Sequence, residues 1–175
     1  MLYIENGDLL QTNCQYICHQ VNCQGKMNSG VAKAIREKWP VVFEKYDEWY
    51  LSFDAWAHAA ADTEDRRNEL KKTVMLGRVL SVPINENQFV LNFASQFGYG
   101  YDGKRYTSYD AFWMCLGAIR STVPKGSSIA FPYGIGCVRG GANWEIIQTM
   151  IKEVLADDYE VHIYKLEENE NERNT

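Results

Sequence analysis

Residues 17–32 read ICHQVNCQGKMNSGVA, and the fold of the chain is decided by this stretch. Its first part has the apolar, β-branched character of a buried strand, and the strand ends in a polar cluster at residues 19–22. A turn follows, and then the apolar spacing of a helix at Val31, Ala34 and Ile35. The N–H groups of such a turn and of a helix N-terminus attract anions, so the stretch predicts a phosphate-binding site.

A second glycine-rich turn occurs late in the chain. Residues 132–141 read PYGIGCVRGG, again after an apolar strand pattern and before a helical one. Two such turns in one small α/β domain predict a ligand with two phosphates, or with a phosphate and a sugar, as in a nucleotide diphosphate.

The bulk composition is that of one ordinary globular domain. The chain has 175 residues, of which 46% are hydrophobic and 23% charged. Its net charge of −5 argues against a broad nucleic-acid-binding surface, although it leaves room for a local basic pocket. No apolar run reaches membrane-spanning length and no signal sequence precedes Leu2-Tyr3-Ile4, so we expect a cytoplasmic protein without membrane contact. The oligomeric state is not predicted by the sequence.

The cysteines are expected to be free thiols. Five are present, an odd number without a CxxC pair, which is typical of a reducing compartment: Cys14, Cys18, Cys23, Cys115 and Cys137. Cys14, Cys18, His19 and Cys23 lie close enough in sequence to suggest zinc, but most of them follow one strand whose side chains alternate between faces. We therefore expect neither a metal nor a cofactor.

Strand and helix patterns alternate along the chain. Six segments have strand composition: Leu2–Ile4, Tyr16–Val21, Arg78–Ile84, Gln88–Phe93, Ser128–Phe131 and Glu160–Leu166. Four segments have helical spacing: residues 31–39 (followed by Pro40), 42–53, 109–119 (opened by Thr107 or Ser108) and 144–154 (opened by Asn143). This alternation predicts a sheet covered on both faces, with ligands at the carboxyl ends of the strands.

A single domain is expected over residues 1–166. Residues 54–73 are rich in alanine and then densely charged, which predicts an extension of the second helix or an exposed insertion. The polar residues 167–175 are predicted to form a disordered tail.

Several motifs together resemble the macrodomain family, whose members bind ADP-ribose. The similarity spans Leu2 to about Leu166 and is greatest to the subgroup that holds yeast and phage ADP-ribose-1″-phosphate phosphatases. The motifs are Gly7-Asp8-Leu9, residues 19–25 (HQVNCQG), Ser29-Gly30-Val31-Ala32, Trp39-Pro40, residues 92–98 (NFASQFG) and residues 140–144 (GGANW). The resemblance implies a three-layer α/β/α fold with a central mixed sheet of about six strands.

The resemblance also implies roles for individual residues. Asp8 matches the carboxylate that accepts a hydrogen bond from the adenine amino group, although a Gly-Asp pair is also a common turn. Asn22 matches the asparagine that binds the distal ribose, where an amide can donate a hydrogen bond to one hydroxyl and accept one from another. The other implied ligand contacts are Leu9, Gln20, Met27, Asn28, Ser29, Gly30, Val31, Gln96, Ile135, Gly136, Cys137, Gly140 and Gly141.

Four positions depart from the family pattern or stay open. Asn28 replaces a glycine beside the diphosphate, and Val138 replaces another in the second turn. Arg139 stands where many relatives have an aromatic residue, so it either weakens binding or offers a guanidinium to a terminal phosphate. Lys26 either neutralises a phosphate or is a solvated loop residue.

The catalytic residues of two related groups are missing. Macrodomains that remove ADP-ribose from glutamate or from thymidine use a lysine after the Asn-Phe strand and an aspartate before the late tryptophan. Here the strand continues Ala94-Ser95-Gln96, and Asn143 replaces the aspartate. An amide cannot act as a base near neutral pH, so this mechanism is not expected.

Hydrolysis by a positioned water remains, and the resemblance favours release of phosphate from ADP-ribose-1″-phosphate. Asn22 would position the water, and His19 is either a proton carrier or a structural histidine, because strand alternation places it opposite Gln20 and Asn22. Arg105 either clamps the terminal phosphate or is solvated. A non-catalytic ADP-ribose reader and an O-acetyl-ADP-ribose deacetylase are the alternatives.

Overall fold

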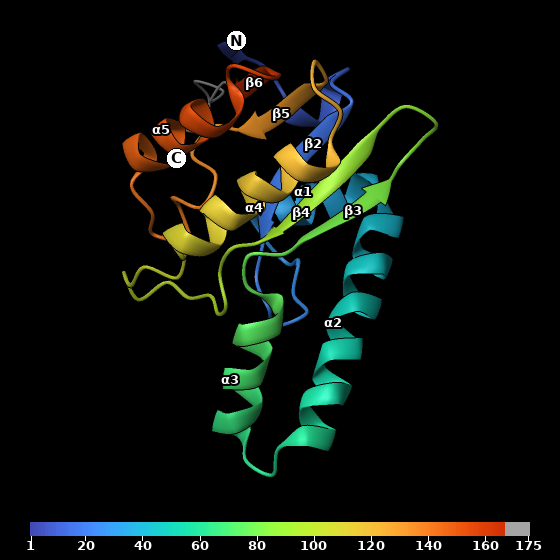
Figure 1. Ribbon diagram of the computed structural model, residues 1–175, viewed down its shortest axis with the longest axis vertical. Coiled ribbons are helices and arrows are strands. Elements are labelled where there is room, and N and C mark those ends of the chain that lie inside the picture. Colours follow the sequence, from blue (N-terminus) through green and yellow to red (C-terminus); the bar gives the residue numbers. More distant parts are fainter. Residues whose placement is uncertain (167–175) are drawn as a thin grey trace, which may run out of the picture.

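Figure 1 shows a computed structural model of the protein, which describes residues 1–166, so the predicted tail at 167–175 lies outside the described part. The strands are β1 (Leu2–Asn6), β2 (Tyr16–Val21), β3 (Val79–Pro83), β4 (Phe89–Ala94), β5 (Ser128–Pro132) and β6 (Glu160–Lys165). The helices are α1 (Gly30–Lys38), α2 (Pro40–Ala60), α3 (Glu64–Met75), α4 (Tyr109–Thr122) and α5 (Trp144–Leu155), with a short 3-10 turn at Leu9–Gln11.

The six strands form one mixed sheet in the order β1-β6-β5-β2-β4-β3. All neighbouring strands are parallel except β3, which runs antiparallel to β4 at the edge. The mixed α/β fold predicted from the sequence is therefore confirmed. Because β2 and β5 are adjacent and parallel, their carboxyl ends and the two glycine-rich turns emerge side by side.

Two apolar cores flank the sheet, because its central strands β2, β4 and β5 bury apolar side chains on both faces. The core on one face joins α4 and α5 to residues such as Cys18, Phe93 and Phe131. The core on the other face joins α1, α2 and the end of α3 to residues such as Ile17 and Val21. Alternate residues of β2 thus serve opposite cores, and the layers are helix, sheet and helix.

Helix caps follow side-chain chemistry. Asn143 caps α5 by accepting from Glu145 N and Ile146 N, as predicted. Of the two candidates at α4, Ser108 is the cap and accepts from Ala111 N. Trp39 separates α1 from α2, because Pro40 cannot continue the first helix but fits the first turn of the second.

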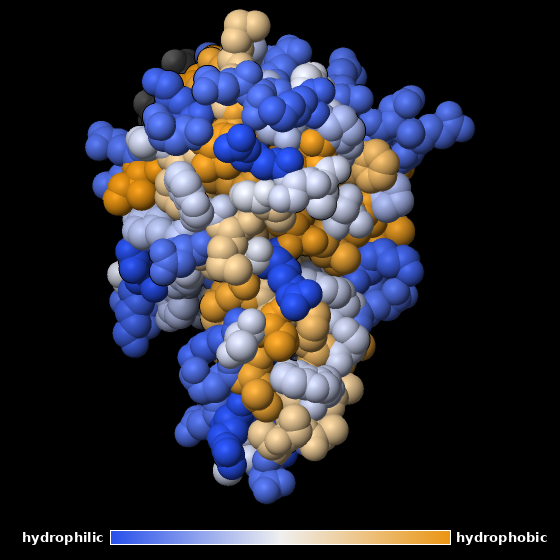
Figure 2. Space-filling model, viewed as in Figure 1, coloured by the Kyte–Doolittle hydropathy of each residue, from blue (hydrophilic) through white to orange (hydrophobic). Residues whose placement is uncertain are grey.

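The charged residues after α2 form the helix α3, which packs antiparallel to the far half of α2 (Figure 1). We refer to the projecting parts of α2 and α3, residues 50–72, as the arm. Thr63 caps α3, and Lys71 Nζ, almost fully buried, donates to Asp54 Oδ1 at 2.8 Å. Figure 2 shows apolar side chains along the arm between charged ones. The segment predicted as a helical extension or an insertion is thus a helical hairpin.

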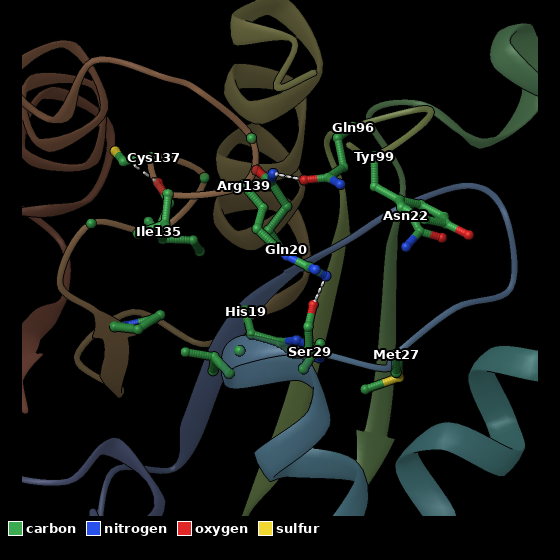
Figure 3. Close-up of a pocket in the computed structure, with 18 of the residues that line it drawn as sticks. His19, Gln20, Asn22, Met27, Ser29, Gln96, Tyr99, Ile135, Cys137 and Arg139 are labelled. Atoms are coloured by element: carbon green, nitrogen blue, oxygen red, sulfur yellow. Dashed lines mark hydrogen bonds between the residues drawn. The ribbon is translucent and has the colours of Figure 1, made fainter. Parts of the chain in front are cut away.

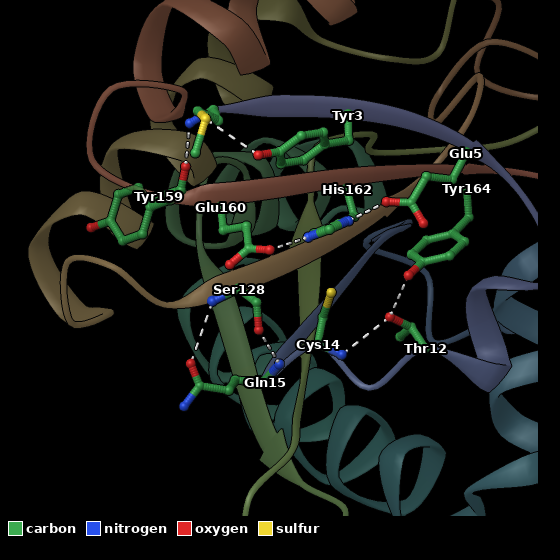
Figure 4. A network of polar contacts seen from close by, with 11 residues as sticks. Tyr3, Glu5, Thr12, Cys14, Gln15, Ser128, Tyr159, Glu160, His162 and Tyr164 are labelled. Carbon is green, nitrogen blue, oxygen red and sulfur yellow. Dashed lines mark hydrogen bonds and ion pairs between the residues drawn. The ribbon is translucent and has the colours of Figure 1, made fainter.

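The opposite edge of the sheet is held by polar contacts (Figure 4). His162 on β6 lies between Glu5 of β1 and Glu160, with its Nε2 3.0 Å from Glu160 Oε1. Tyr164 and Thr12 join through their hydroxyls at 3.0 Å. Within residues 1–166, no helix is both long and apolar enough to cross a membrane.

Candidate functional site

A cavity of about 450 Å³ opens between the loop from β2 to α1 and the loop from β5 to α5 (Figure 3). We call these the first loop (residues 22–29) and the second loop (residues 133–143). The predicted residues that line the cavity are His19, Gln20, Asn22, Lys26, Met27, Asn28, Ser29, Gly30, Val31, Gln96, Ile135, Gly136, Cys137, Val138, Arg139 and Gly140. The two turns recognised in the sequence therefore share one cavity, at the carboxyl ends of the central strands.

The first loop is built around the side chain of Asn22. Its Oδ1 accepts from Gln24 N at 2.9 Å and from Lys26 N at 3.3 Å, while its Nδ2 donates to the Lys26 carbonyl at 2.8 Å. Asn22 thus holds the turn in which Gly25 has a φ of +69°. One N–H of its amide remains free for a ligand, so a ribose contact through donation is compatible with this structural role.

Tyr46 of α2 stabilises this loop through its hydroxyl. This role was not predicted from the sequence. Its hydroxyl lies 2.8 Å from the Asn22 carbonyl oxygen, 2.9 Å from Asn22 Oδ1 and 3.2 Å from Lys26 N. Burial raises the pKa of Tyr46 well above its usual value. The helical spacing predicted only that Tyr46 faces the core, because a contact between residues of α2 and the first loop leaves no local pattern.

The glycines of the second loop are required by close approach. A Cβ at Gly140 would lie 2.0 Å from Thr107 Oγ1 and 2.3 Å from the Gly136 carbonyl oxygen. Gly136 has a φ of +74°, and a Cβ there would lie 2.8 Å from Gln20 Oε1. The second loop can lie this close to β2 and to Thr107 only without side chains at these two positions.

Gln20 connects the end of β2 to the end of β4 and, through Thr107, to the second loop. Its Nε2 donates to Gln96 Oε1 and, at 2.9 Å, to Thr107 Oγ1, and its Oε1 accepts from Ser95 Oγ at 2.7 Å. Thr107 in turn donates to the Gly136 carbonyl at 2.8 Å. The network fixes the cavity wall, and it also engages Ser95 and Gln96 of the segment Ala94-Ser95-Gln96, in which the resemblance leads one to expect a lysine.

His19 lies on the other face of β2 from Gln20, as the alternation predicted. Asn92 is its register partner on β4, and the Asn92 Oδ1 lies 2.6 Å from His19 Nε2. Asn92 Nδ2 donates to the Leu80 carbonyl, so Asn92 Oδ1 is the acceptor and His19 Nε2 carries the proton. Burial, only partly offset by this bond, lowers the pKa of His19 to about 4. The imidazole is therefore neutral near pH 7, and its position favours the structural alternative.

The cavity is electropositive although the chain is acidic. Lys26 and Arg139 line it, whereas none of its lining residues within the described part of the chain is an aspartate or glutamate. The N-terminus of α1 adds the positive end of its dipole through Gly30, Val31 and Ala32. This arrangement is suited to an anion.

Four predicted contacts lie away from the cavity lining. Asp8 accepts from Leu10 N at 2.9 Å and caps the short 3-10 turn, and Leu9 is buried in the core beneath α1 and α2. Arg105 places its guanidinium 4.5 Å from the centre of the Tyr109 ring. Gly141, with a φ of +67°, faces the backbone of Lys104 and Arg105.

Other lining residues were not predicted, namely Ala32, Tyr99, Tyr101, Pro132, Tyr133 and Gly134. The loop that carries Tyr99 and Tyr101 reads GYGYDGKRY over residues 98–106, and its tyrosines between glycines were the available signal. Four cysteines are buried and Cys137 is half-buried; burial raises the pKa of all five thiols. Residues 1–166 contain no cluster of three or more side chains that could hold a metal ion.

Comparison with known proteins yields matches among solved structures. No protein-family model matches the chain, and no curated protein matches it. A protein of unknown function from Bacteroides thetaiotaomicron is 27% identical, with a TM-score of 0.75 over 95% of this chain and 98% of its own. The macrodomain of Mycobacterium tuberculosis DarG is 19% identical, with a TM-score of 0.69 over 94% of this chain and 97% of its own.

A third structure is the Trypanosoma brucei macrodomain in complex with ADP-ribose. It is 12% identical, with a TM-score of 0.60 over 98% of this chain and 66% of its own. At these identities the similarity to the two macrodomains concerns the fold. The sheet order, the two helical layers and these neighbours agree, and the chain has the macrodomain fold.

Proposed function

We propose that this chain binds ADP-ribose, or a phosphorylated derivative of it, in the cavity between the first and second loops. The observation that carries the proposal is the charge of the cavity: two cations and a helix N-terminus line it, and no carboxylate does among the described residues. A diphosphate is the ligand group whose charge such a surface neutralises.

The size and the walls of the cavity support the same ligand class. A volume of about 450 Å³ is within the usual range for small-molecule sites. Met27 and Ile135 supply apolar surface, and Tyr99 and Tyr133 supply aromatic surface for a base or a ribose. ADP-ribose is the ligand of the Trypanosoma brucei macrodomain, which shares the fold.

For the activity, we propose hydrolysis of ADP-ribose-1″-phosphate. A water oxygen would form a bond to phosphorus, the bond from phosphorus to the 1″ oxygen would break, and a proton from the water would pass to the 1″ oxygen, which yields ADP-ribose and inorganic phosphate. Lys26, which lines the cavity, supplies positive charge for such a phosphomonoester. Glycohydrolysis through a lysine adduct lacks its residues here, because Ala94-Ser95-Gln96 contain no lysine and Asn143 stands in place of the aspartate.

A non-hydrolysing ADP-ribose reader is the second candidate. The cavity lining has no carboxylate among the described residues, and His19 is a weak base, because burial lowers its pKa to about 4 while its Nε2 donates to Asn92. A general base for the attacking water is therefore not evident on the protein. This observation favours binding without turnover.

Two measurements on one sample separate the candidates. We expect saturable calorimetric binding of ADP-ribose, and release of phosphate from ADP-ribose-1″-phosphate that is lost in Asn22→Ala. The matched control is Asn87→Ala, which makes the same change on the exposed turn between β3 and β4.

The outcomes identify the function. Binding without release would make the chain a reader, and absence of ADP-ribose binding would overturn the proposal itself. Hydrolysis of O-acetyl-ADP-ribose without release of phosphate from ADP-ribose-1″-phosphate would instead favour the deacetylase.

A further inference from the structure

Arg139 reaches across the cavity from the second loop to the first. Its Nη1 donates to Ser29 Oγ, a contact between residues 110 positions apart in the chain (Figure 3). Its guanidinium carbon lies 3.9 Å from the centre of the Tyr101 ring, on the loop between β4 and α4. One side chain thus joins three segments that surround the cavity mouth.

No carboxylate within residues 1–166 neutralises the charge of Arg139. None of the ion pairs within residues 1–166 includes it, and its two partners are a neutral hydroxyl and an aromatic ring. Most of the donors of its planar guanidinium are therefore available. Stacking on Tyr101 restricts the plane of the group without using those donors.

Ser29 provides the second observation. It occupies the N-cap position of α1, but its side chain makes no capping hydrogen bond and instead accepts from Arg139. The first N–H groups of α1 consequently lack a side-chain acceptor, and the residues that follow, Gly30 and Val31, line the cavity. The guanidinium and these N–H groups converge on the same space.

We propose that Arg139 is a clamp for the diphosphate of the ligand, which makes this residue the determinant of selectivity for diphosphate-bearing ligands. The inference rests on the proposed function for the identity of the ligand. A phosphate oxygen replaces Ser29 Oγ as the acceptor, because a charged oxygen is a stronger partner for a guanidinium than a hydroxyl. Tyr101 holds the guanidinium plane over the α1 N-terminus, where the diphosphate receives N–H groups from the helix and from the arginine.

The test uses calorimetry with ADP-ribose and with inorganic pyrophosphate on the wild-type chain, Arg139→Ala and Arg139→Lys. Arg66→Ala is the matched control, since Arg66 is exposed on α3, far from the cavity. We expect Arg139→Ala to raise the Kd of both ligands about 10- to 100-fold, as for loss of a hydrogen bond to a charged group. Arg139→Lys should recover part of the affinity, because an ammonium keeps the charge but not the planar fork.

Salt dependence separates a clamp from a merely structural role. Removal of a charge that contacts phosphate should lower the slope of log Kd against log salt in Arg139→Ala but not in Arg139→Lys. A loosened loop would raise Kd and leave that slope unchanged, which would overturn the clamp. Unchanged Kd values in Arg139→Ala would overturn it as well.

The experiment also distinguishes the clamp from the proposed function. If the wild type binds pyrophosphate through Arg139 but not ADP-ribose, the clamp stands and the assignment of the ligand fails. If the wild type binds ADP-ribose equally well with and without Arg139, the ligand stands and the clamp fails. If the wild type binds neither ligand, both proposals fail.

Discussion

The side chain of Asn22 has two roles at the scale of single residues. It fixes the first loop through Gln24 and Lys26, and within residues 1–166 its Nδ2 donates only one hydrogen bond, so that a second N–H is available to a ligand. Tyr46 holds Asn22 in turn, although α2 carries it on the far side of the loop from the cavity. Ligand affinity should therefore depend on a residue that does not line the cavity.

We expect Tyr46→Phe to weaken ADP-ribose binding without removing any ligand contact. The change deletes a buried hydroxyl and leaves Asn22 Oδ1 and Lys26 N with fewer partners, which costs about 1–2 kcal/mol of unfolding free energy. Urea unfolding and calorimetry measure the two effects. Tyr16→Phe is the control, because no hydrogen bond involves the Tyr16 hydroxyl within residues 1–166. If the affinity for ADP-ribose is unchanged in Tyr46→Phe, the hydrogen bonds of Tyr46 to the first loop do not contribute to binding.

At the scale of elements, strands and helices with a strong apolar period could be predicted from the sequence. β2, β4 and β5 are largely apolar and are bounded by polar turns, so their ends were predicted to within one residue. α3 could not be predicted as a separate helix, because its residues are mostly charged and no apolar stripe marks it. It is held by the Thr63 cap and by the buried pair of Lys71 with Asp54, which only the fold brings together.

We expect Asp54→Ala to destabilise the arm. Lys71, 6% exposed, would lose the carboxylate that compensates its burial, at a cost of about 1–3 kcal/mol of unfolding free energy. The double variant Asp54→Ala/Lys71→Met should regain most of this loss, because no buried charge is left without a partner. Urea unfolding measures both, with Asp62→Ala as the exposed control. A double variant no more stable than Asp54→Ala would exclude this explanation.

The β1–β6 edge should lose stability as the pH rises. Burial alone would lower the pKa of His162, but hydrogen bonds to Glu5 and Glu160 outweigh it and raise the pKa. Since the folded state binds the proton more tightly, the contribution is fully present below the unfolded pKa of about 6.5 and is lost as pH rises through the higher folded value. The urea midpoint should fall over this range in the wild type and less in His162→Gln. If the urea midpoint falls equally in the wild type and in His162→Gln, the titration of His162 is not the cause of the loss of stability.

At the scale of the whole molecule, the sequence predicted which turns form the site but not how they are joined. Each loop has a local signal in its glycines, whereas the contact of Arg139 with Ser29 and that of Gln20 with Thr107 span distant parts of the chain. Asp8 was placed by resemblance and Arg105 by its loop; Asp8 caps a 3-10 turn and Arg105 lies over the Tyr109 ring, and a ligand contact of either residue stays a prediction. Long-range side-chain contacts therefore account for most of what the sequence could not reveal.

These contacts predict where a ligand changes the dynamics of the molecule. ADP-ribose should slow amide hydrogen exchange in the first loop, the second loop and the Tyr99–Tyr106 loop, because Arg139 and Gln20 connect all three around the cavity. The outer part of the arm contacts none of these groups, so its exchange should stay unchanged except through the stabilisation of the whole fold that binding brings. Exchange followed by mass spectrometry, with and without saturating ADP-ribose, measures each segment. Protection confined to the arm would place the ligand elsewhere and would also remove the reason for a clamp at Arg139.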